Sequence, residues 1–435
     1  MRTLTATLTY QVLGALCALC LCIVVFKLYA PIVASRFPAP SSDGEWYFRL
    51  AVEGPKGIVA PFSGRILHPL LARVISRTFN IKMEEAFFLV SALSLVLWVC
   101  CVVSLLKPSS LTQLFTHSLV FAYPFIGLIA SQFYFPEIVH AALLSAFLMC
   151  LQRQHQRFCQ YIGLVLLALL VMSREITVLL SIILFARSMV LRRWKYTFGV
   201  AVSTGVGLAI VYIATRQGLP NPEHLPGILY LALKLPFNFL RNVLGIEFVT
   251  DAIWYCEPVV SWRVPDSLQI GNIRTIGLCR WNPNRALSTL GALLTIFGLW
   301  PTILLWAART RRLPKAPWVT IALAYGTLAY LIGTSVGSGV FRLVSYGWPL
   351  IIVAIASFDQ IAEKKRALPL FLLLSVFSLA VAWLPEFTNS LTSRLFHEKA
   401  AFLSSAMVLF ISLIAHLYTF RFLMVRTPNK SFSPP

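Results

Sequence analysis

The sequence predicts an all-α polytopic membrane protein, from its composition and from the length of its apolar runs. Of the 435 residues, 58% are hydrophobic and only 12% are charged, whereas soluble domains have roughly 45–50% apolar and about 25% charged residues. Apolar runs of about 20 residues, enough to cross the hydrocarbon core of a bilayer as a helix, recur along the whole chain. This composition excludes a water-soluble enzyme, a disordered chain and a coiled coil.

The charged residues are mainly basic, with 37 Lys and Arg against 16 Asp and Glu and a net charge of +21. In a soluble protein this balance would indicate nucleic-acid binding. Here the cations lie between apolar runs, so the membrane surface explains them and no nucleic-acid partner is expected. The sequence contains no phosphate-binding loop, zinc-protease motif or serine-hydrolase motif.

Twelve apolar runs are candidates for transmembrane helices. They cover residues 8–29, 84–106, 112–130, 136–151, 160–173, 174–190, 196–215, 287–308, 317–335, 341–358, 367–385 and 399–420. The fourth, fifth and sixth runs are short for a full crossing, so we expect about 12 transmembrane helices within a range of roughly 10–13. The first run is long enough to span the bilayer, which favours a retained signal anchor over a cleaved signal peptide.

Short basic segments follow every even-numbered run. Since Lys and Arg are enriched in cytoplasmic loops, both termini are expected in the cytoplasm. Two long loops, residues 30–83 and 216–286, then lie on the outer side, as do all the acidic residues except Asp359 and Glu363. We expect a multi-pass protein of a bacterial inner membrane, with the endoplasmic reticulum membrane as the alternative.

The first outer loop begins with an acidic segment. Ser42 and Glu45 have the spacing of a capping box, which predicts a short helix with Asp43 in its first turn. A helix N-terminus stabilises a carboxylate, so Asp43 is expected to be ionised and able to accept a proton or bind a cation. Trp46 and Tyr47 add flat aromatic faces, and Glu45 and Tyr47 are further cavity candidates. The alternative is a surface helix that Asp43 only caps.

Residues 61–77 of the same loop predict an amphipathic helix that lies on the bilayer surface. Arg73 and Arg77 are expected to extend toward the lipid headgroups. Arg65 and His68 lie in a segment flanked by Gly and Pro, which favours a position facing a cavity. A lone histidine is, however, more often structural than a ligand.

Ionisable residues also lie at the predicted outer ends of several helices. Glu137 and His140 begin the fourth apolar run, and Arg174 and Glu175 separate the fifth from the sixth. Charged groups at membrane depth are costly and usually face a cavity, so all four are cavity candidates. Alternatively, Glu137 only caps its helix, and Arg174 and Glu175 pair with each other.

Arg342 lies at the outer end of the tenth run, shortly after Gly337 and Gly339. A cation on this side does not serve the positive-inside rule, so Arg342 is a candidate phosphate-binding residue. Extension toward the headgroups is the alternative.

The second outer loop contains the remaining features of interest. Cys256 and Cys279 both lie in it, and they are a candidate disulfide if the loop faces an oxidising compartment. Residues 226–244 predict a second interfacial helix.

Three segments together resemble the GT-C superfamily of polytopic membrane glycosyltransferases. Asp43–Ala51 resembles the acidic motif of its first outer loop, Pro61–Pro69 resembles the segment that follows, and Phe341–Arg342 resembles its late arginine. The chain differs from common variants in having Asp43-Gly44-Glu45 in place of two adjacent acids, and it lacks a sizeable soluble C-terminal domain. The resemblance implies a single transmembrane domain over residues 1–435 with an active site on the outer face.

The resemblance also implies an activity. Such enzymes transfer a sugar, here a hexose such as mannose, from a polyprenyl-phosphate donor to a lipid, glycan or protein acceptor. Asp43 would then be the general base, and Arg342 and Arg65 would bind the donor phosphate. No cofactor is required, although a divalent metal ion bridging Asp43 and Glu137 would be compatible with these residues.

A transporter or flippase of an amphiphilic substrate is the main alternative, and a non-catalytic lipid-binding subunit is a third. A transporter typically has polar residues near the bilayer midplane, in broken helices related by internal repeats. The sequence shows no repeat, and its ionisable residues gather at outer helix ends, which favours the enzyme.

Overall fold

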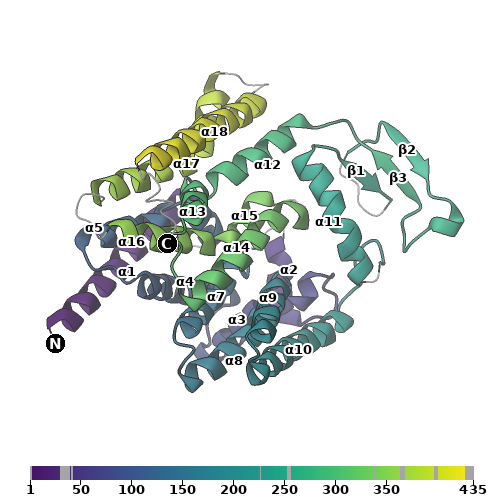
Figure 1. Ribbon diagram of the computed structural model, residues 1–435. Helices are drawn as coiled ribbons and strands as arrows, with labels where there is room; N and C mark the ends of the chain where they lie inside the picture. Colours follow the sequence, from purple (N-terminus) through teal and green to yellow (C-terminus); the bar gives the residue numbers. More distant parts are fainter. Residues whose placement is uncertain are drawn as a thin grey trace.

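The computed structural model describes residues 2–29, 40, 43–225, 227–251, 256–337, 339–362, 368–395 and 400–426. Within these ranges the chain is almost entirely α-helical, with one small sheet (Figure 1). The helices are α1 (Arg2–Tyr29), α2 (Asp43–Glu53), α3 (Leu67–Phe79), α4 (Met83–Leu106), α5 (Leu111–Leu119), α6 (Pro124–Ser131), α7 (Glu137–Gln152), α8 (Arg157–Ser173), α9 (Thr177–Val190), α10 (Trp194–Gln217), α11 (Gly227–Val243), α12 (Pro283–Thr295), α13 (Trp300–Arg309), α14 (Pro317–Val336), α15 (Val340–Val344), α16 (Pro349–Ala362), α17 (Leu368–Leu395) and α18 (Ala400–Arg426).

Six described helices are long and apolar enough to cross a membrane: α1, α4, α10, α14, α17 and α18. Three helix pairs pass the same test only as bent units, α5–α6 at 53°, α12–α13 at 61° and α15–α16 at 42°, which raises the number to nine. Helices α7, α8 and α9 are apolar but shorter. The protein is therefore a multi-pass membrane protein by helix length and composition, whereas twelve separate crossings remain a prediction.

Each bend has a local cause in the sequence. Pro124 and Pro349 are the first residues of α6 and α16, and proline favours the start of a helix because it has no N–H to donate. Between α12 and α13, Gly298 adopts a left-handed conformation with φ of 51°, followed by Pro301 in the first turn of α13. These breaks change the direction of the chain within apolar segments, so one apolar run supplies two helices.

Gly333 on α14 and Gly347 just after α15 allow the short helix α15 to lie close against α14. A Cβ atom added at Gly333 would come within 2.7 Å of the backbone of Val344. One added at Gly347 would lie 3.0 Å from the carbonyl oxygen of Gly326. Since side chains at these positions would push the segments apart, the glycines set the position of α15, and with it the position of Arg342.

Helices α2 and α3 form a smaller unit with its own aromatic core beside α4. Tyr47 is buried there, 5.8 Å from the ring of Phe135. Arg73 of α3 donates to the carbonyl oxygens of Ala51 and, at 2.8 Å, Val52. The expectation that Arg73 extends toward headgroups is therefore wrong, because the last carbonyls of α2 are unpaired within the helix and bind this guanidinium instead.

The second loop contains α11 and a three-stranded antiparallel sheet that the sequence did not predict. Strands β1 (Phe248–Thr250), β2 (Val260–Arg263) and β3 (Thr275–Leu278) lie in the order β1-β3-β2. The strands are only three or four residues long and β2 is exposed, so no alternating pattern marks them. The predicted disulfide is confirmed: Cys256 and Cys279 are bonded, with their Cα atoms 6.2 Å apart.

Candidate functional site

Asp43 and Arg342 meet although they are 299 residues apart in the sequence. Asp43 is the first residue of α2, as predicted, while Ser42 of the expected capping box lies outside the described residues. The Nη2 atom of Arg342 donates to Oδ2 of Asp43 at 3.0 Å, and the guanidinium lies 4.6 Å from the centre of the Phe135 ring. The Asp43 side chain is 34% exposed and that of Arg342 18% exposed, so both are accessible.

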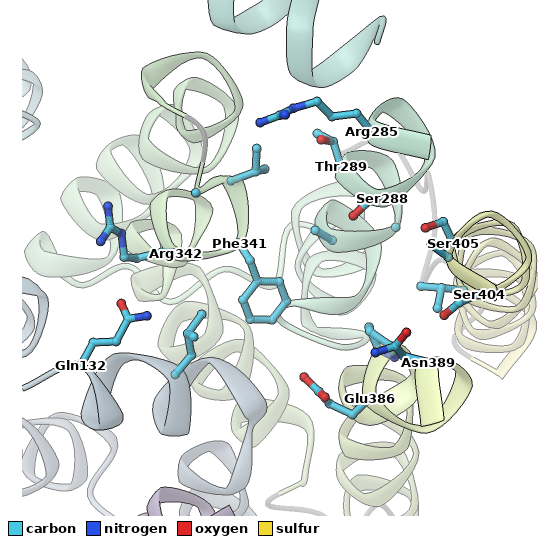
Figure 2. A pocket seen from close by; sticks show the side chains of 18 of the residues that line it. Gln132, Arg285, Ser288, Thr289, Phe341, Arg342, Glu386, Asn389, Ser404 and Ser405 are labelled. Carbon is cyan, nitrogen blue, oxygen red and sulfur yellow. The ribbon is translucent and has the colours of Figure 1, made fainter. Parts of the chain in front are cut away.

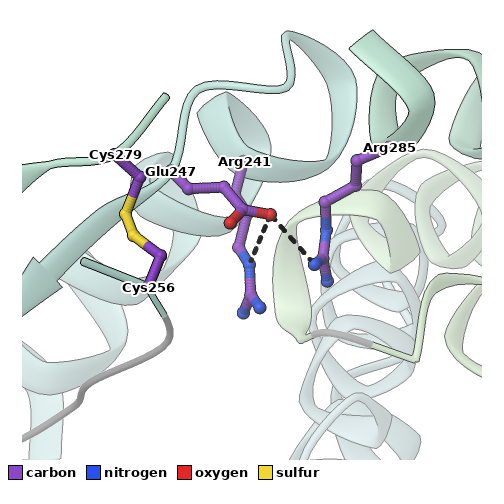
Figure 3. Close-up of a disulfide and its surroundings, with 5 residues drawn as sticks. All are labelled: Arg241, Glu247, Cys256, Cys279 and Arg285. Carbon is purple, nitrogen blue, oxygen red and sulfur yellow. Dashed lines mark hydrogen bonds and ion pairs between the residues drawn. A yellow bond between two sulfur atoms is a disulfide. The ribbon is translucent and has the colours of Figure 1, made fainter. Parts of the chain in front are cut away.

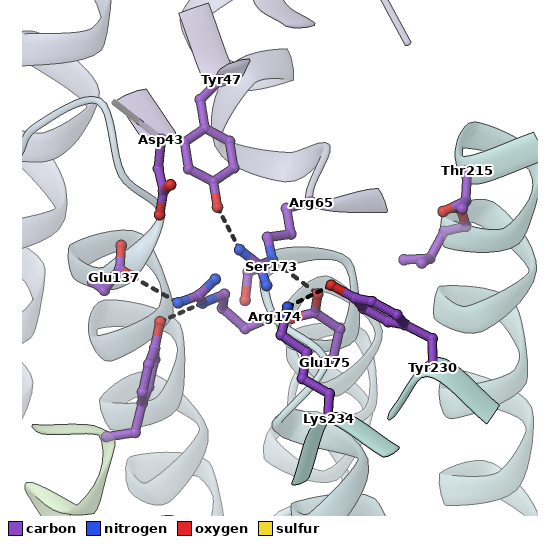
Figure 4. Close-up of polar contacts among 12 residues, drawn as sticks. Asp43, Tyr47, Arg65, Glu137, Ser173, Arg174, Glu175, Thr215, Tyr230 and Lys234 are labelled. Atoms are coloured by element: carbon purple, nitrogen blue, oxygen red, sulfur yellow. Dashed lines mark hydrogen bonds and ion pairs between the residues drawn. The ribbon is translucent and has the colours of Figure 1, made fainter. Parts of the chain in front are cut away.

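Glu137 and Arg174 lie directly behind this pair and are buried. The Nη2 atom of Arg174 donates to Oε1 of Glu137 at 2.8 Å, and the Nε atom of Arg342 lies 3.6 Å from the same oxygen. Arg174 also donates to the hydroxyl of Tyr346. Figure 4 shows Asp43 of α2, Glu137 of α7 and Arg174, from the break between α8 and α9, converging. We call Asp43, Glu137, Arg174 and Arg342 the ion cluster; two acids balance two arginines, which offsets the cost of burial.

Arg65 and Glu175 form a second group beside the ion cluster. The Nε atom of Arg65 donates to Oε1 of Glu175 at 2.8 Å, and its Nη1 atom donates to the Tyr47 hydroxyl at 2.8 Å (Figure 4). Burial raises the pKa of Tyr47, although the positive charge of Arg65 opposes this. Glu175 thus pairs with Arg65, from the first outer loop, and the Arg65 guanidinium already has two partners.

A pocket of about 900 Å³ opens next to the ion cluster. Asp43 and Arg342 line it, and Phe341 lies between Arg342 and the side chains of α17 and α18 (Figure 2). Among the described residues that line the pocket, neither Glu137 nor Arg174 appears, because both lie deeper. Asp43 and Arg342 are therefore the members of the ion cluster that a ligand in the pocket can reach.

The ion cluster does not fit the divalent metal that Asp43 and Glu137 suggested. The guanidinium of Arg342 contacts Asp43 through Nη2 and approaches Glu137 through Nε. A positive group thus already lies between the two carboxylates, and a metal ion there would be repelled. One other described group has metal-like spacing, Glu247 with Cys256 and Cys279, but both sulfurs are in the disulfide.

The two candidate histidines are buried away from the pocket. His140 contacts the Ser173 hydroxyl at 3.0 Å and the Tyr325 hydroxyl at 3.1 Å. His68 packs edge-on against Phe87 with ring centres 4.9 Å apart, and burial lowers its pKa to about 4. Neither is among the described pocket-lining residues, so both have structural positions. Glu45 is exposed and, within the described chain, makes no contact with the ion cluster.

Sequence reasoning missed two charged residues that line the pocket, Arg285 on α12 and Glu386 on α17. Arg285 is a cation at a predicted outer helix end, which is the feature that drew attention to Arg342. It donates to Glu247 at 3.2 Å and to Asn242 at 3.1 Å. The backbone carbonyl of Glu247, not its carboxylate, accepts from the N–H of Cys279 at 2.8 Å. Figure 3 shows the Glu247 carboxylate between Arg241 and Arg285, with the disulfide beside it.

No family model matches this chain, and no curated protein matches it. The functional argument therefore depends on the site. The site presents an arginine that can bind an anion, a neighbouring carboxylate that can accept a proton, and a pocket of about 900 Å³ within a helical membrane protein. A partly exposed Asp–Arg pair beside a large pocket suits chemistry in which one group is anionic and another is a hydroxyl that must lose its proton.

Proposed function

We propose that the protein is an integral-membrane glycosyltransferase that resembles the GT-C superfamily. It transfers a hexose, such as mannose, from a polyprenyl phosphate to a lipid, glycan or protein acceptor. The observation that carries the proposal is the contact of Asp43 with Arg342 at 3.0 Å in a pocket of about 900 Å³. In this proposal the chain crosses a bacterial inner membrane about twelve times, with both termini in the cytoplasm and the pocket on the other face.

The proposed reaction assigns one role to each of these two residues. Arg342 binds the donor phosphate, whose lipid chain stays in the bilayer, so no nucleotide site is needed. The acceptor hydroxyl oxygen attacks the anomeric carbon and its proton passes to Asp43. The bond from the anomeric carbon to the phosphate oxygen breaks, and Arg342 stabilises the negative charge on the departing polyprenyl phosphate.

The contact between Asp43 and Arg342 has a consequence for the order of events. While Arg342 donates to it, Oδ2 of Asp43 is directed at the guanidinium and not at an acceptor hydroxyl. A donor phosphate at Arg342 competes with Asp43 for the same N–H groups. Donor binding therefore releases the Asp43 carboxylate toward the acceptor, which links proton transfer to the presence of the donor.

Glu137 acts as a positioning residue in this scheme. Its carboxylate is 2% exposed and lies 2.8 Å from Arg174 and 3.6 Å from Arg342. From this buried position it fixes the direction of the Arg342 side chain after the donor phosphate has displaced Asp43. Without Glu137, Arg342 has no second carboxylate among the described residues to hold it at the pocket.

The proposal is tested with the full-length protein in membranes, supplied with a panel of radiolabelled polyprenyl-phosphate hexoses and an extract of membrane lipids as acceptor. At least one donor is expected to lose its sugar to an acceptor. Arg342→Ala is expected to raise the KM for the donor and to lower kcat, because Arg342 contacts phosphate both in the ground state and in the transition state.

Arg77→Ala is the matched control, since Arg77 lies outside the described pocket lining. Its activity is expected to equal that of the wild type. A wild-type protein that transfers sugar from none of the donors contradicts the proposal.

A transporter of an amphiphile is the second candidate, and one structural observation favours it. The bent pairs α5–α6, α12–α13 and α15–α16 interrupt apolar segments by 42–61°, and transporters form binding sites at such breaks. Reconstituted vesicles distinguish the two functions. Flux of a fluorescent polyprenyl-phosphate analogue without sugar transfer supports the transporter.

A further inference from the structure

The pocket extends beyond the Asp43–Arg342 pair to a second wall made by α12, α17 and α18. In Figure 2 Arg342 lies on one side, the side chains of α17 and α18 lie on the other, and the ring of Phe341 stands between them. The proposed reaction gives a role only to the Arg342 side. The opposite wall, which we call the far wall, has a chemical character of its own.

The far wall is polar although it belongs to apolar helices. Its polar lining residues are Ser288, Thr289, Glu386, Asn389, Ser404 and Ser405. Glu386 and Asn389 are exposed, one turn apart on α17, and both side chains point toward the pocket (Figure 2). Polar groups on membrane helices usually face a partner or a cavity, and these groups line the pocket, where a polar ligand can reach them.

Part of the far wall is held in a fixed geometry. The hydroxyl of Ser404 is buried and lies 3.1 Å from the hydroxyl of Thr388 on α17. This contact ties α18 to α17 beside Asn389. Ser405 follows on the same helix and is partly exposed to the pocket. The hydroxyl and amide groups of the two helices thus lie next to each other.

These groups select among ligand types by their hydrogen-bonding capacity. A carboxylate accepts from two hydroxyls, an amide both donates and accepts, and a serine hydroxyl does either. An acyl chain satisfies none of them, and Glu386 repels a second anion. The nearby cation Arg285 is engaged by Glu247 at 3.2 Å. A ring with several hydroxyls can form hydrogen bonds with the accessible members Glu386, Asn389 and Ser405, and its apolar face can pack on Phe341.

We infer that the far wall binds a polyhydroxylated ring, that is, the carbohydrate part of a substrate. Its assignment to a substrate of sugar transfer rests on the proposed function, whereas the binding itself does not. The ring belongs either to the donor sugar or to a sugar on the acceptor; both have the same chemistry.

Binding is tested first and without any need for turnover. The full-length protein in lipid nanodiscs is titrated with methyl α-mannopyranoside, methyl β-glucopyranoside and methyl β-galactopyranoside, with cyclohexylmethanol as an apolar ring of similar size. Saturation-transfer NMR reports the bound fraction. At least one glycoside is expected to bind, whereas cyclohexylmethanol is expected not to bind.

Glu386→Gln and Asn389→Ala are each expected to weaken glycoside binding roughly tenfold, the effect of losing one hydrogen bond to a charged or amide group. Glu257→Gln removes an exposed acid outside the described pocket lining and is the matched control. Because Glu386 and Asn389 are both exposed, their variants are expected to fold. If one does not, Ser405→Ala is measured in its place. Equal binding by all variants, or no binding of any glycoside by the wild type, overturns the inference.

A transfer assay then identifies the source of the ring. A higher KM for the acceptor in Glu386→Gln assigns the ring to the acceptor, and a higher KM for the donor assigns it to the donor sugar. If neither KM changes, the far wall is not a substrate site. Specific glycoside binding by a protein that transfers no sugar would instead reject the proposed function and leave the inference in place.

Discussion

Replacing Glu137 by glutamine tests the ion cluster at its most buried point. Glu137 and Arg174 are 2% and 3% exposed and lie 2.8 Å apart. Glutamine keeps the size and one acceptor oxygen but removes the charge, so Arg174 loses its buried carboxylate partner. Breaking a buried ion pair in this way costs about 3–5 kcal/mol. Since Arg174 keeps the hydroxyl of Tyr346, we expect about 3 kcal/mol for Glu137→Gln.

The double variant Glu137→Gln/Arg174→Gln gives the sharper result. It removes both charges, so no unpaired charge stays buried, and it is expected to be more stable than Glu137→Gln alone. The assay is unfolding in mixed micelles of a mild detergent and sodium dodecyl sulfate, monitored by tryptophan fluorescence. Glu45→Gln, an exposed acid, is the control and is expected to change stability by less than about 0.5 kcal/mol. If Glu137→Gln unfolds at the same detergent fraction as the wild type, the cluster as described is wrong.

Three further predictions concern other parts of the molecule. Cys256→Ser is expected to cost about 3 kcal/mol, because the unfolded chain regains the entropy that the cross-link removes, and limited proteolysis of residues 256–282 measures it; unchanged cleavage would contradict this. Buried His68 has a pKa of about 4 against 6.5 when unfolded. Between pH 6.5 and pH 4 the unfolded chain therefore binds a proton at His68 that the folded chain does not bind. The free energy of unfolding falls by about 3 kcal/mol over this range. His68→Gln is expected to remove this part of the pH dependence, as unfolding at pH 7 and pH 5 shows; an equal slope in both proteins counts against a buried neutral His68. Cysteines placed at the exposed positions 56 and 260 are expected to react with an impermeant maleimide added from outside, whereas labelling only after lysis would reverse the predicted topology.

The helices could be predicted from the sequence because hydrophobic length is a local property. Each of the twelve apolar runs coincides with one helix or with a bent pair of helices in the structure. The bends were not predicted. They depend on Gly298, Pro301 and Pro349, which in a sequence look like ordinary residues within a run.

The candidate site could be predicted in part. Asp43 and Arg342 stand out because each is charged at a place where topology does not require the charge, and the structure brings them to 3.0 Å. Their roles in catalysis stay predictions. The positions of Arg65 and His68 depended on packing between α2, α3 and α4, which no local pattern reveals.

Residues of the far wall were missed for a physical reason. Glu386 and Asn389 become conspicuous only when α17 and α18 are seen to face α12 across the pocket. A serine or asparagine on an apolar helix is common, and its meaning depends on the neighbouring helix. The small sheet was missed because its strands carry no period of alternation, and the Cys256–Cys279 bond was the local sign of order in that loop.

The most direct test of the account is the turnover of Asp43→Asn with the donor that the wild-type protein uses. Asparagine keeps the shape and the helix N-terminal position of Asp43 but accepts no proton. The account predicts that kcat falls by roughly 10²–10⁴-fold, the usual contribution of a general base, while donor binding is unchanged or tighter because Arg342 has lost its competing carboxylate. Transfer by Asp43→Asn at the wild-type rate would contradict the central claim.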